Sequence, residues 1–187
     1  MADAAFTSLT SERLLLRRFQ PGDLDAFVDY RSDPQVARYQ SWELPYLPSQ
    51  ARQFLADLQA IHPDTPGEWF QFAVALRRTD LLIGDCAALV RADDPRQAEI
   101  GFTLGRAHQG QGYGTEAVRR LLDYLLIQRG KHRVSANCDA RNTRSAALLE
   151  RVGMRREGHL RESTWCKGEW TSDLLYAVLG REWPASP

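Results

Sequence analysis

The chain has 187 residues, of which 43% are hydrophobic and 26% are charged, a composition typical of one compact domain rather than of a disordered segment. Lys and Arg together number 24, as do Asp and Glu, so the formal net charge is zero. No global basic field therefore favours binding to nucleic acid or to an anionic membrane. We expect a single domain over residues 8–184, with short tails at 1–7 and 185–187.

Targeting segments and metal-ligand patterns are the next features that the sequence can indicate. The first residues lack a basic stretch followed by an apolar run, and no 18 apolar residues occur in succession, so a cytoplasmic protein is expected. Cys86, Cys138 and Cys166 are widely spaced without a C-x-x-C pair, which fits reduced thiols. No histidines or cysteines have metal-ligand spacing, and we predict no metal site.

The first part of the chain predicts a strand at residues 13–19 and then a helix capped by Asp23. Residues 33–49, here named the aromatic connection, contain three prolines and three aromatic residues and predict irregular structure. Ser49 is expected to cap a second helix. Long connections often bind ligands, so Tyr39 and Trp42 are candidate substrate contacts. The alternative is that these rings only cover the edge of the core.

The remaining elements follow from hydrophobic periodicity. Strands are expected at 69–76, 81–90 and 97–104, and the short polar turns between them make neighbouring strands antiparallel. Apolar residues at three- and four-residue spacing predict a helix from 113 to 126. A strand at 132–138, a helix at 142–152 and paired strands at 154–162 and 170–179 complete the chain. The order predicts an α/β (α+β) fold with a mixed sheet and helices on both faces.

A glycine-rich segment lies between the fourth predicted strand and the following helix. It reads Gln109-Gly110-Gln111-Gly112-Tyr113-Gly114 and is named here the glycine loop. Glycines allow close approach of the backbone to a ligand, and the first N–H groups of a helix have no intrahelical partner. Such a turn binds phosphate groups. A Walker loop would need a lysine after the last glycine, but Gly114 is followed by Thr115. A dinucleotide fold would place its glycines after the first strand, but here they follow the fourth, so neither motif matches.

Several motifs in the expected order make the chain resemble the GNAT superfamily of N-acetyltransferases. The Q/R-x-x-G-x-G/A motif of that family matches Gln109, Gly112 and Gly114. Residues 10–14 (TSERL), 99–102 (EIGF), 114–117 (GTEA) and the ending from Trp170 to Trp183 resemble its ribosomal-protein N-terminal acetyltransferase branch.

The resemblance implies that acetyl-coenzyme A lies in a cleft where the fourth and fifth strands splay apart. The fourth-strand backbone would pair with the pantetheine, the glycine loop and Thr115 would bind the pyrophosphate, Asn142 would reach the pantetheine, and Ser145 would lie near the sulfur. The implied cofactor contacts are Phe102, Thr103, Leu104, Gln109, Gly110, Gln111, Gly112, Tyr113, Gly114, Thr115, Asn142 and Ser145. From spacing alone, Asn142 is equally well a helix cap and Ser145 a surface residue.

Glu99 and Ser145 are the candidate catalytic residues. Glu99 alternates with Ala98 and Ile100 and shares a strand face with Gly101 and Thr103. In the family, a carboxylate at this strand position often deprotonates the amine; the alternative is a solvated or ion-paired glutamate. Many members place a tyrosine acid in the second helix, where this chain has Leu148 and Leu149, so that role falls to Ser145 or to no residue. Cys138 has no nearby cation in sequence to activate it as a nucleophile.

The expected acceptor is a primary amine. An α-amine, with a pKa of about 7.7–8.0, is far more often neutral at pH 7 than lysine, with a pKa of about 10.4, which favours N-terminal or amino-acid-type acceptors. The resemblance makes a peptide N-terminus the first choice. A polyamine, amino acid or amino-sugar is the first alternative, and a non-catalytic acyl-coenzyme A-binding module is the second. Substrate contacts are expected at Tyr39, Trp42, Trp165 and Trp170, in a monomer or homodimer.

Overall fold

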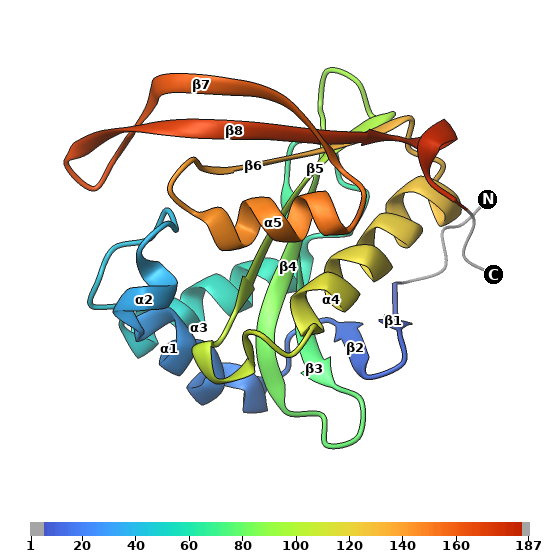
Figure 1. Cartoon of the computed structure of the whole chain (residues 1–187). Helices are drawn as coiled ribbons and strands as arrows, with labels where there is room; N and C mark the ends of the chain where they lie inside the picture. Colours follow the sequence, from blue (N-terminus) through green and yellow to red (C-terminus); the bar gives the residue numbers. More distant parts are fainter. Residues whose placement is uncertain (1–5, 185–187) are drawn as a thin grey trace.

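An eight-stranded sheet with the strand order β1-β2-β3-β4-β5-β6-β8-β7 forms the centre of the molecule, and helices cover both of its faces (Figure 1). The computed structural model describes residues 6–184. The strands are β1 Ser8–Thr10, β2 Leu14–Arg17, β3 Trp69–Leu76, β4 Leu82–Val90, β5 Gln97–Leu104, β6 Arg133–Asp139, β7 Arg155–Cys166 and β8 Glu169–Leu179. Only β5 and β6 pair in parallel, so the predicted mixed, mostly antiparallel sheet is confirmed.

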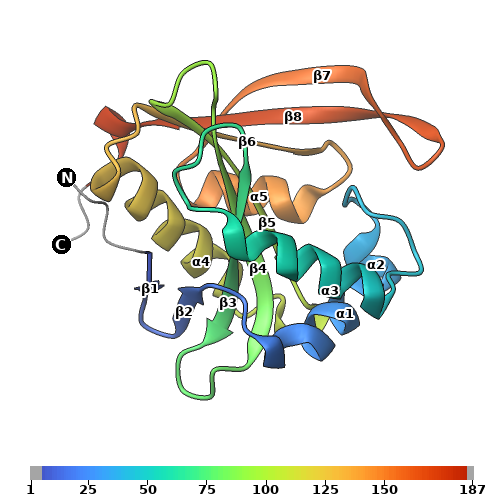
Figure 2. The same ribbon diagram turned by 180° about the vertical axis from the view of Figure 1, so that it is seen from behind.

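Helices α1 to α3 lie on one face of the sheet and α4 and α5 on the other, as the two opposite views show (Figures 1 and 2). Their bounds are α1 Leu24–Ser32, α2 Pro34–Ala37, α3 Pro48–Asp57, α4 Tyr113–Leu122 and α5 Thr143–Arg151. A π-helical segment, Asp123–Gln128, prolongs α4. Single 3-10 turns lie at Pro21–Asp23, Leu58–Ala60, Arg106–His108 and Gly180–Glu182.

Three local expectations were wrong. Strand β1 was not predicted, because a strand of three residues is too short to show an alternation of hydrophobic and polar residues. The aromatic connection contains the short helix α2, since Pro34 occupies its first turn and the Asp33 carboxylate accepts the N–H of Gln35 at 2.8 Å. Helix α3 begins at Pro48 rather than after a Ser49 cap, and the Gln50 side chain accepts the N–H of Leu47 at 2.8 Å.

The main hydrophobic core lies between the sheet and α4 and α5. Along β3, Phe70 and Phe72 face this core, whereas Ala73 faces the opposite one. The apolar stripe of α4 is fully buried against them. Phe6, at the edge of the expected tail, packs edge-on against Phe70 and Phe72, with ring centroids 5.5 and 5.3 Å away. Residues 1–5 and 185–187 of the expected tails lie outside the described residues.

The face covered by α1 to α3 buries charged groups as well as a second apolar cluster. Arg17 donates to both carboxylate oxygens of Asp23 at 2.7 and 3.0 Å. The Arg31 guanidinium lies 3.7 Å from Asp85, whose other partner is the Tyr30 hydroxyl. Four aromatic rings surround the Arg31 guanidinium: Phe27, Trp42, Tyr46 and Phe54.

Within residues 6–184, no helix is long and apolar enough to cross a membrane. The same residues contain no group of three or more His, Cys, Asp or Glu side chains arranged to hold a metal ion.

Candidate active site

The sheet opens between β5 and β6, which pair in parallel. β5 pairs with β6 from Gln97 to Ile100 and no further. Beyond Ile100, β5 continues along β4 as far as Leu104, while β6 continues along β8 as far as Asp139. This gap between β5 and β6, named here the opening, matches the splaying apart of the fourth and fifth predicted strands that the family resemblance implied.

The backbone of β5 presents unpaired hydrogen-bonding groups to the opening. Gly105 donates its N–H to Ile83 in β4, and Gln97 accepts from Arg91 at the other end of β5, so the odd-numbered residues turn their backbone groups toward β4. Strand alternation then directs those of Phe102 and Leu104 toward the opening. Of the three predicted contacts in this strand, Phe102 therefore suits pairing with a ligand amide through both of its backbone groups. Leu104 offers only its N–H, because its carbonyl accepts from the Gln109 side chain. The backbone groups of Thr103 are turned toward β4, and its side chain is buried.

The glycine loop follows β5 and leads directly into α4. Gly110 and Gly112 have φ angles of 76° and 82°, in the left-handed region that favours glycine. Within residues 6–184, no oxygen accepts a hydrogen bond from the backbone N–H groups of residues 110–115. These N–H groups and the positive end of the α4 dipole form a binding site suited to an anion.

Side chains from neighbouring elements hold the glycine loop in place. Gln109 donates to the Leu104 carbonyl at 2.9 Å and accepts from Arg144 at 3.2 Å. Arg151 donates to the Thr115 hydroxyl at 3.2 Å. Sequence reasoning missed both arginines, and their only signal was their position two turns apart beyond Asn142.

Close helix packing explains the last glycine of the motif. A Cβ atom at Gly114 would lie 2.8 Å from a Leu148 methyl group and 3.3 Å from one of Leu104. The absent side chain lets the start of α4 approach both α5 and the end of β5, so the loop N–H groups and the opening belong to one continuous site.

These observations fit coenzyme A, which carries two amides in its pantetheine arm and a pyrophosphate. The free backbone groups of β5 can pair with amides, and the N–H groups of residues 110–115 can bind phosphate oxygens. The exposed Arg144 and Arg151 add positive charge at the surface of the same site.

Glu99 lies beside the opening on the face of the sheet that α1 to α3 cover. Ile100 belongs to the main core on the opposite face, and Glu99 pairs in register with Ser135 of β6. Partial burial raises the pKa of Glu99 above the ordinary glutamate value, and Arg91 opposes this shift weakly. A carboxyl group with a raised pKa at the edge of a cleft is suited to accept a proton.

Gln71 is a further polar residue on this face that sequence reasoning missed. In register it lies opposite Ala87, and Ala87 in turn lies opposite Gly101. Its side-chain carbonyl oxygen is buried and has no hydrogen-bond partner within residues 6–184. A single glutamine in an apolar strand gives no sequence signal for this, because the missing partner is a property of the packed sheet.

Asn142 and Ser145 lie at the start of α5, on the face of the sheet opposite to Glu99. The Asn142 side chain accepts the N–H of Ser145 at 3.2 Å, so Asn142 is a helix N-cap. Of Leu148 and Leu149, which stand where the resemblance leads us to expect a tyrosine acid, Leu149 is buried in the core. Burial, with Asp139 and Asp173 nearby, raises the pKa of the Cys138 thiol to about 11, so Cys138 is a poor nucleophile.

The predicted acceptor contacts divide into two groups. Trp42 stacks on Arg31 at 4.2 Å and donates its indole N–H to the Arg31 carbonyl at 3.0 Å, so Trp42 is part of the fold. Tyr39 is partly exposed and lies between the guanidinium groups of Arg38 and Arg141.

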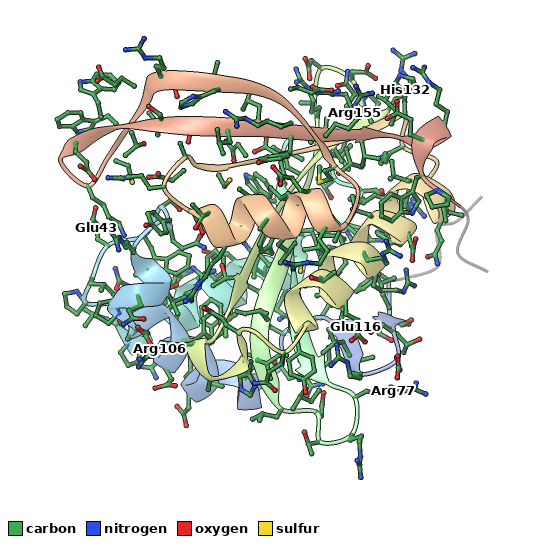
Figure 3. All side chains as sticks on the ribbon, viewed as in Figure 1. Glu43, Arg77, Arg106, Glu116, His132 and Arg155 are labelled. Carbon is green, nitrogen blue, oxygen red and sulfur yellow. The ribbon has the colours of Figure 1, made fainter. Side chains whose placement is uncertain are left out.

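Trp165 and Trp170 form the second group, at the tip of the β7–β8 hairpin. They pack edge-on at 5.4 Å and remain 60% and 58% exposed. A pocket of about 530 Å³ separates this hairpin from the aromatic connection, where Glu43 is located (Figure 3). Its lining residues are Ser41, Glu43, Thr164, Trp165, Cys166, Lys167 and Gly168.

Comparisons with known proteins agree with this geometry. The family described as "Acetyltransferase (GNAT) domain" matches residues 13–155. An uncharacterized N-acetyltransferase, p20, from Bacillus licheniformis is 32% identical over 176 residues, which cover 94% of this chain and 98% of that protein. The [ribosomal protein uS5]-alanine N-acetyltransferase of Escherichia coli is 24% identical over 180 residues, covering 94% and 92%.

Solved structures share the fold. A GNAT-family acetyltransferase from Bacillus anthracis superposes with a TM-score of 0.83 at 28% identity, covering 94% of this chain and 100% of that one. Spermidine N-acetyltransferase from Vibrio cholerae, in complex with coenzyme A and spermine, has a TM-score of 0.78 at 21% identity, covering 92% and 98%. The chain therefore belongs to the GNAT acetyltransferase family and is an acetyl-coenzyme A-dependent N-acetyltransferase.

Proposed function

We propose that this enzyme acetylates the α-amine of a protein or peptide N-terminus. The observation that carries the proposal is the exposed Trp165, which lines a pocket of about 530 Å³ and packs against the equally exposed Trp170. Exposed aromatic rings beside an open pocket are typical of surfaces that bind polypeptides. The likeness to a ribosomal-protein alanine N-acetyltransferase supports the same acceptor class.

The proposed reaction is direct transfer in a ternary complex. The neutral amine attacks the thioester carbonyl, the C–N bond forms and the C–S bond breaks. Glu99 takes the proton that the attacking nitrogen loses, directly or through water, and the Ser145 hydroxyl donates to the departing sulfur. A thiolate, with a thiol pKa near 8.5, is a good leaving group, so a weak acid such as serine suffices.

A small-molecule amine is the second candidate acceptor, favoured by the likeness to spermidine N-acetyltransferase. A polyamine carries several positive charges and needs several carboxylates to hold it. The acceptor pocket is lined by one carboxylate, Glu43, and one ammonium group, Lys167. This balance of charge favours a peptide backbone over a polyamine.

An acceptor panel tests the proposal by following free thiol release from acetyl-coenzyme A. Peptides that begin with Ala or Ser should be acetylated with a higher kcat/KM than spermidine, free amino acids or amino-sugars. Turnover of spermidine with none of the peptides would contradict the proposal and support the second candidate.

Removal of the hairpin rings tests the route of entry. Replacing both Trp165 and Trp170 with Ala should raise the KM for a peptide acceptor roughly tenfold, because two exposed aromatic contacts are lost. The KM for acetyl-coenzyme A should not change. Ile127→Ala is the matched control, since Ile127 is 47% exposed on the π-helical segment that prolongs α4. Equal effects of the hairpin and control changes would argue against docking at the hairpin.

A further inference from the structure

Two motifs that the sequence resemblance singled out, at residues 10–14 and 114–117, meet in one cluster of hydrogen bonds. Glu116 in the first turn of α4 accepts from the Ser11 hydroxyl at 2.7 Å and from the Arg13 backbone N–H at 2.7 Å. The Arg13 guanidinium also donates to Glu116, at 2.6 Å. Residues about a hundred positions apart in the chain thus join the turn between β1 and β2 to the start of α4, where Glu116 lies (Figure 3).

The same guanidinium group contacts the glycine loop. Arg13 donates through Nη1 to the Gln111 carbonyl at 3.0 Å, and it lies 4.6 Å from the centre of the Tyr113 ring. Its Nη2 atom lies 3.2 Å from the position that a Cβ atom would occupy at Gly112. Within residues 6–184, Nη2 has no acceptor. One planar group is therefore fixed against a carboxylate, a loop carbonyl and an aromatic ring, with a free donor beside the loop.

The negative charge of Glu116 is compensated by the guanidinium group of Arg13. Burial raises the pKa of Glu116, but the hydrogen bonds from Arg13 and Ser11 outweigh this effect and hold it below the ordinary glutamate value. Glu116 is therefore ionised in the first turn of the helix whose start would bind a pyrophosphate, and an unpaired carboxylate there would repel it. The loop carries no lysine of its own, so Arg13 supplies the compensating charge from the turn between β1 and β2.

We propose that Arg13 is a positioning residue of the cofactor site: paired with Glu116, it fixes the glycine loop in the conformation that binds the pyrophosphate and directs its free Nη2 donor to that group. The proposal rests on the placement of the pyrophosphate at the glycine loop. A purely structural link between the β1–β2 turn and α4 is the alternative, and it would not depend on which thioester the enzyme uses.

Two acetyl donors separate these roles, because acetyl-coenzyme A contains the pyrophosphate and S-acetylpantetheine does not. Arg13→Gln should raise the KM for acetyl-coenzyme A about tenfold, the effect of losing a hydrogen bond to a charged group. It should leave kcat/KM for S-acetylpantetheine unchanged. Arg77→Gln is the matched control, since Arg77 is also exposed and donates to Ser11, at 3.4 Å, without contacting the loop.

Two further variants test the geometry of the contact. Arg13→Lys should not restore the wild-type KM, because one ammonium group cannot reproduce the fork that reaches both Glu116 and Gln111. Glu116→Gln should raise the KM for acetyl-coenzyme A in the same direction as Arg13→Gln, since it frees the guanidinium from its fixed position.

The outcomes are distinct. An unchanged KM for acetyl-coenzyme A in Arg13→Gln, or an equal loss with both donors, would overturn the role of Arg13. A wild-type enzyme that uses S-acetylpantetheine as efficiently as acetyl-coenzyme A would instead contradict the pyrophosphate site itself. Neither result bears on the identity of the amine acceptor.

Discussion

The two faces of the sheet are built from different kinds of contact. The face beneath α4 and α5 is a hydrophobic core, with the glycine loop at its edge. The face beneath α1 to α3 contains the buried charged residues of the described chain: Arg17, Asp23, Arg31 and Asp85. The face beneath α4 and α5, where we propose that the cofactor binds, is named here the cofactor side and is formed mainly by apolar packing and free backbone groups. The face beneath α1 to α3, where the proposed base Glu99 lies, is named here the acceptor side and is formed by side-chain ion pairs and rings.

This difference indicates where each side is vulnerable. Backbone geometry at the cofactor side depends on a few glycines that are close together in sequence. The acceptor side depends on partners far apart in the chain, such as Tyr30 and Asp85, so one lost partner leaves a buried charge without compensation.

The largest expected effect is on the buried ion pair. Asp85→Asn should lower the free energy of unfolding by about 3 kcal/mol, because it leaves the Arg31 guanidinium buried and uncompensated. Urea unfolding measures this loss. Asp93→Asn removes an exposed carboxylate that pairs with Arg91 and should have no measurable effect. Equal stability of the two variants would show that the buried Arg31 does not need the charge of Asp85 for stability.

Glu99 gives the next largest effect, on catalysis rather than stability. Glu99→Gln should lower kcat/KM for an amine acceptor about a hundredfold, the contribution typical of a general base. Glu157→Gln, which changes an exposed glutamate of β7, should retain full activity.

The pH dependence of the same reaction sharpens this prediction. Burial raises the pKa of Glu99, so the proton-accepting carboxylate is lost as pH falls through a value above that of an ordinary glutamate. The wild-type kcat/KM should therefore fall at acid pH with an apparent pKa above that of an ordinary glutamate. Glu99→Gln should abolish this acid limb of the pH profile. The limb that reports deprotonation of the amine should remain in both enzymes. An acid limb that persists in Glu99→Gln would assign the base to another group.

Gly112 gives a smaller expected effect, confined to the cofactor side. Gly112→Ala should raise the dissociation constant for coenzyme A about tenfold, because a Cβ atom strains a φ of 82° and approaches Arg13. Gly130→Ala is a matched control, with a φ of 62°, open surroundings and a position far from the loop. Calorimetric titration should show weaker binding for Gly112→Ala alone, although both variants lose stability. Unchanged binding would contradict the placement of the pyrophosphate at the glycine loop.

Sequence alone determined much of the cofactor side. The stripe of apolar residues in α4 and the positions of Gly112 and Gly114 are patterns within a few turns of chain, which local backbone physics makes readable. The mixed sheet and its helices on both faces followed from the order of elements. The roles of Glu99 and Ser145 stay predictions.

Only the tertiary structure decided the contacts between side chains, because these contacts depend on which residues distant in the chain come together. Packing turned Trp42 onto Arg31, left the Gln71 carbonyl without a partner, and brought Arg13 against Glu116 and the glycine loop. Hydrogen bonds and ion pairs between residues dozens of positions apart follow no sequence period. The sequence could therefore predict a loop suited to phosphate, but only the tertiary structure brought Arg13 into contact with that loop.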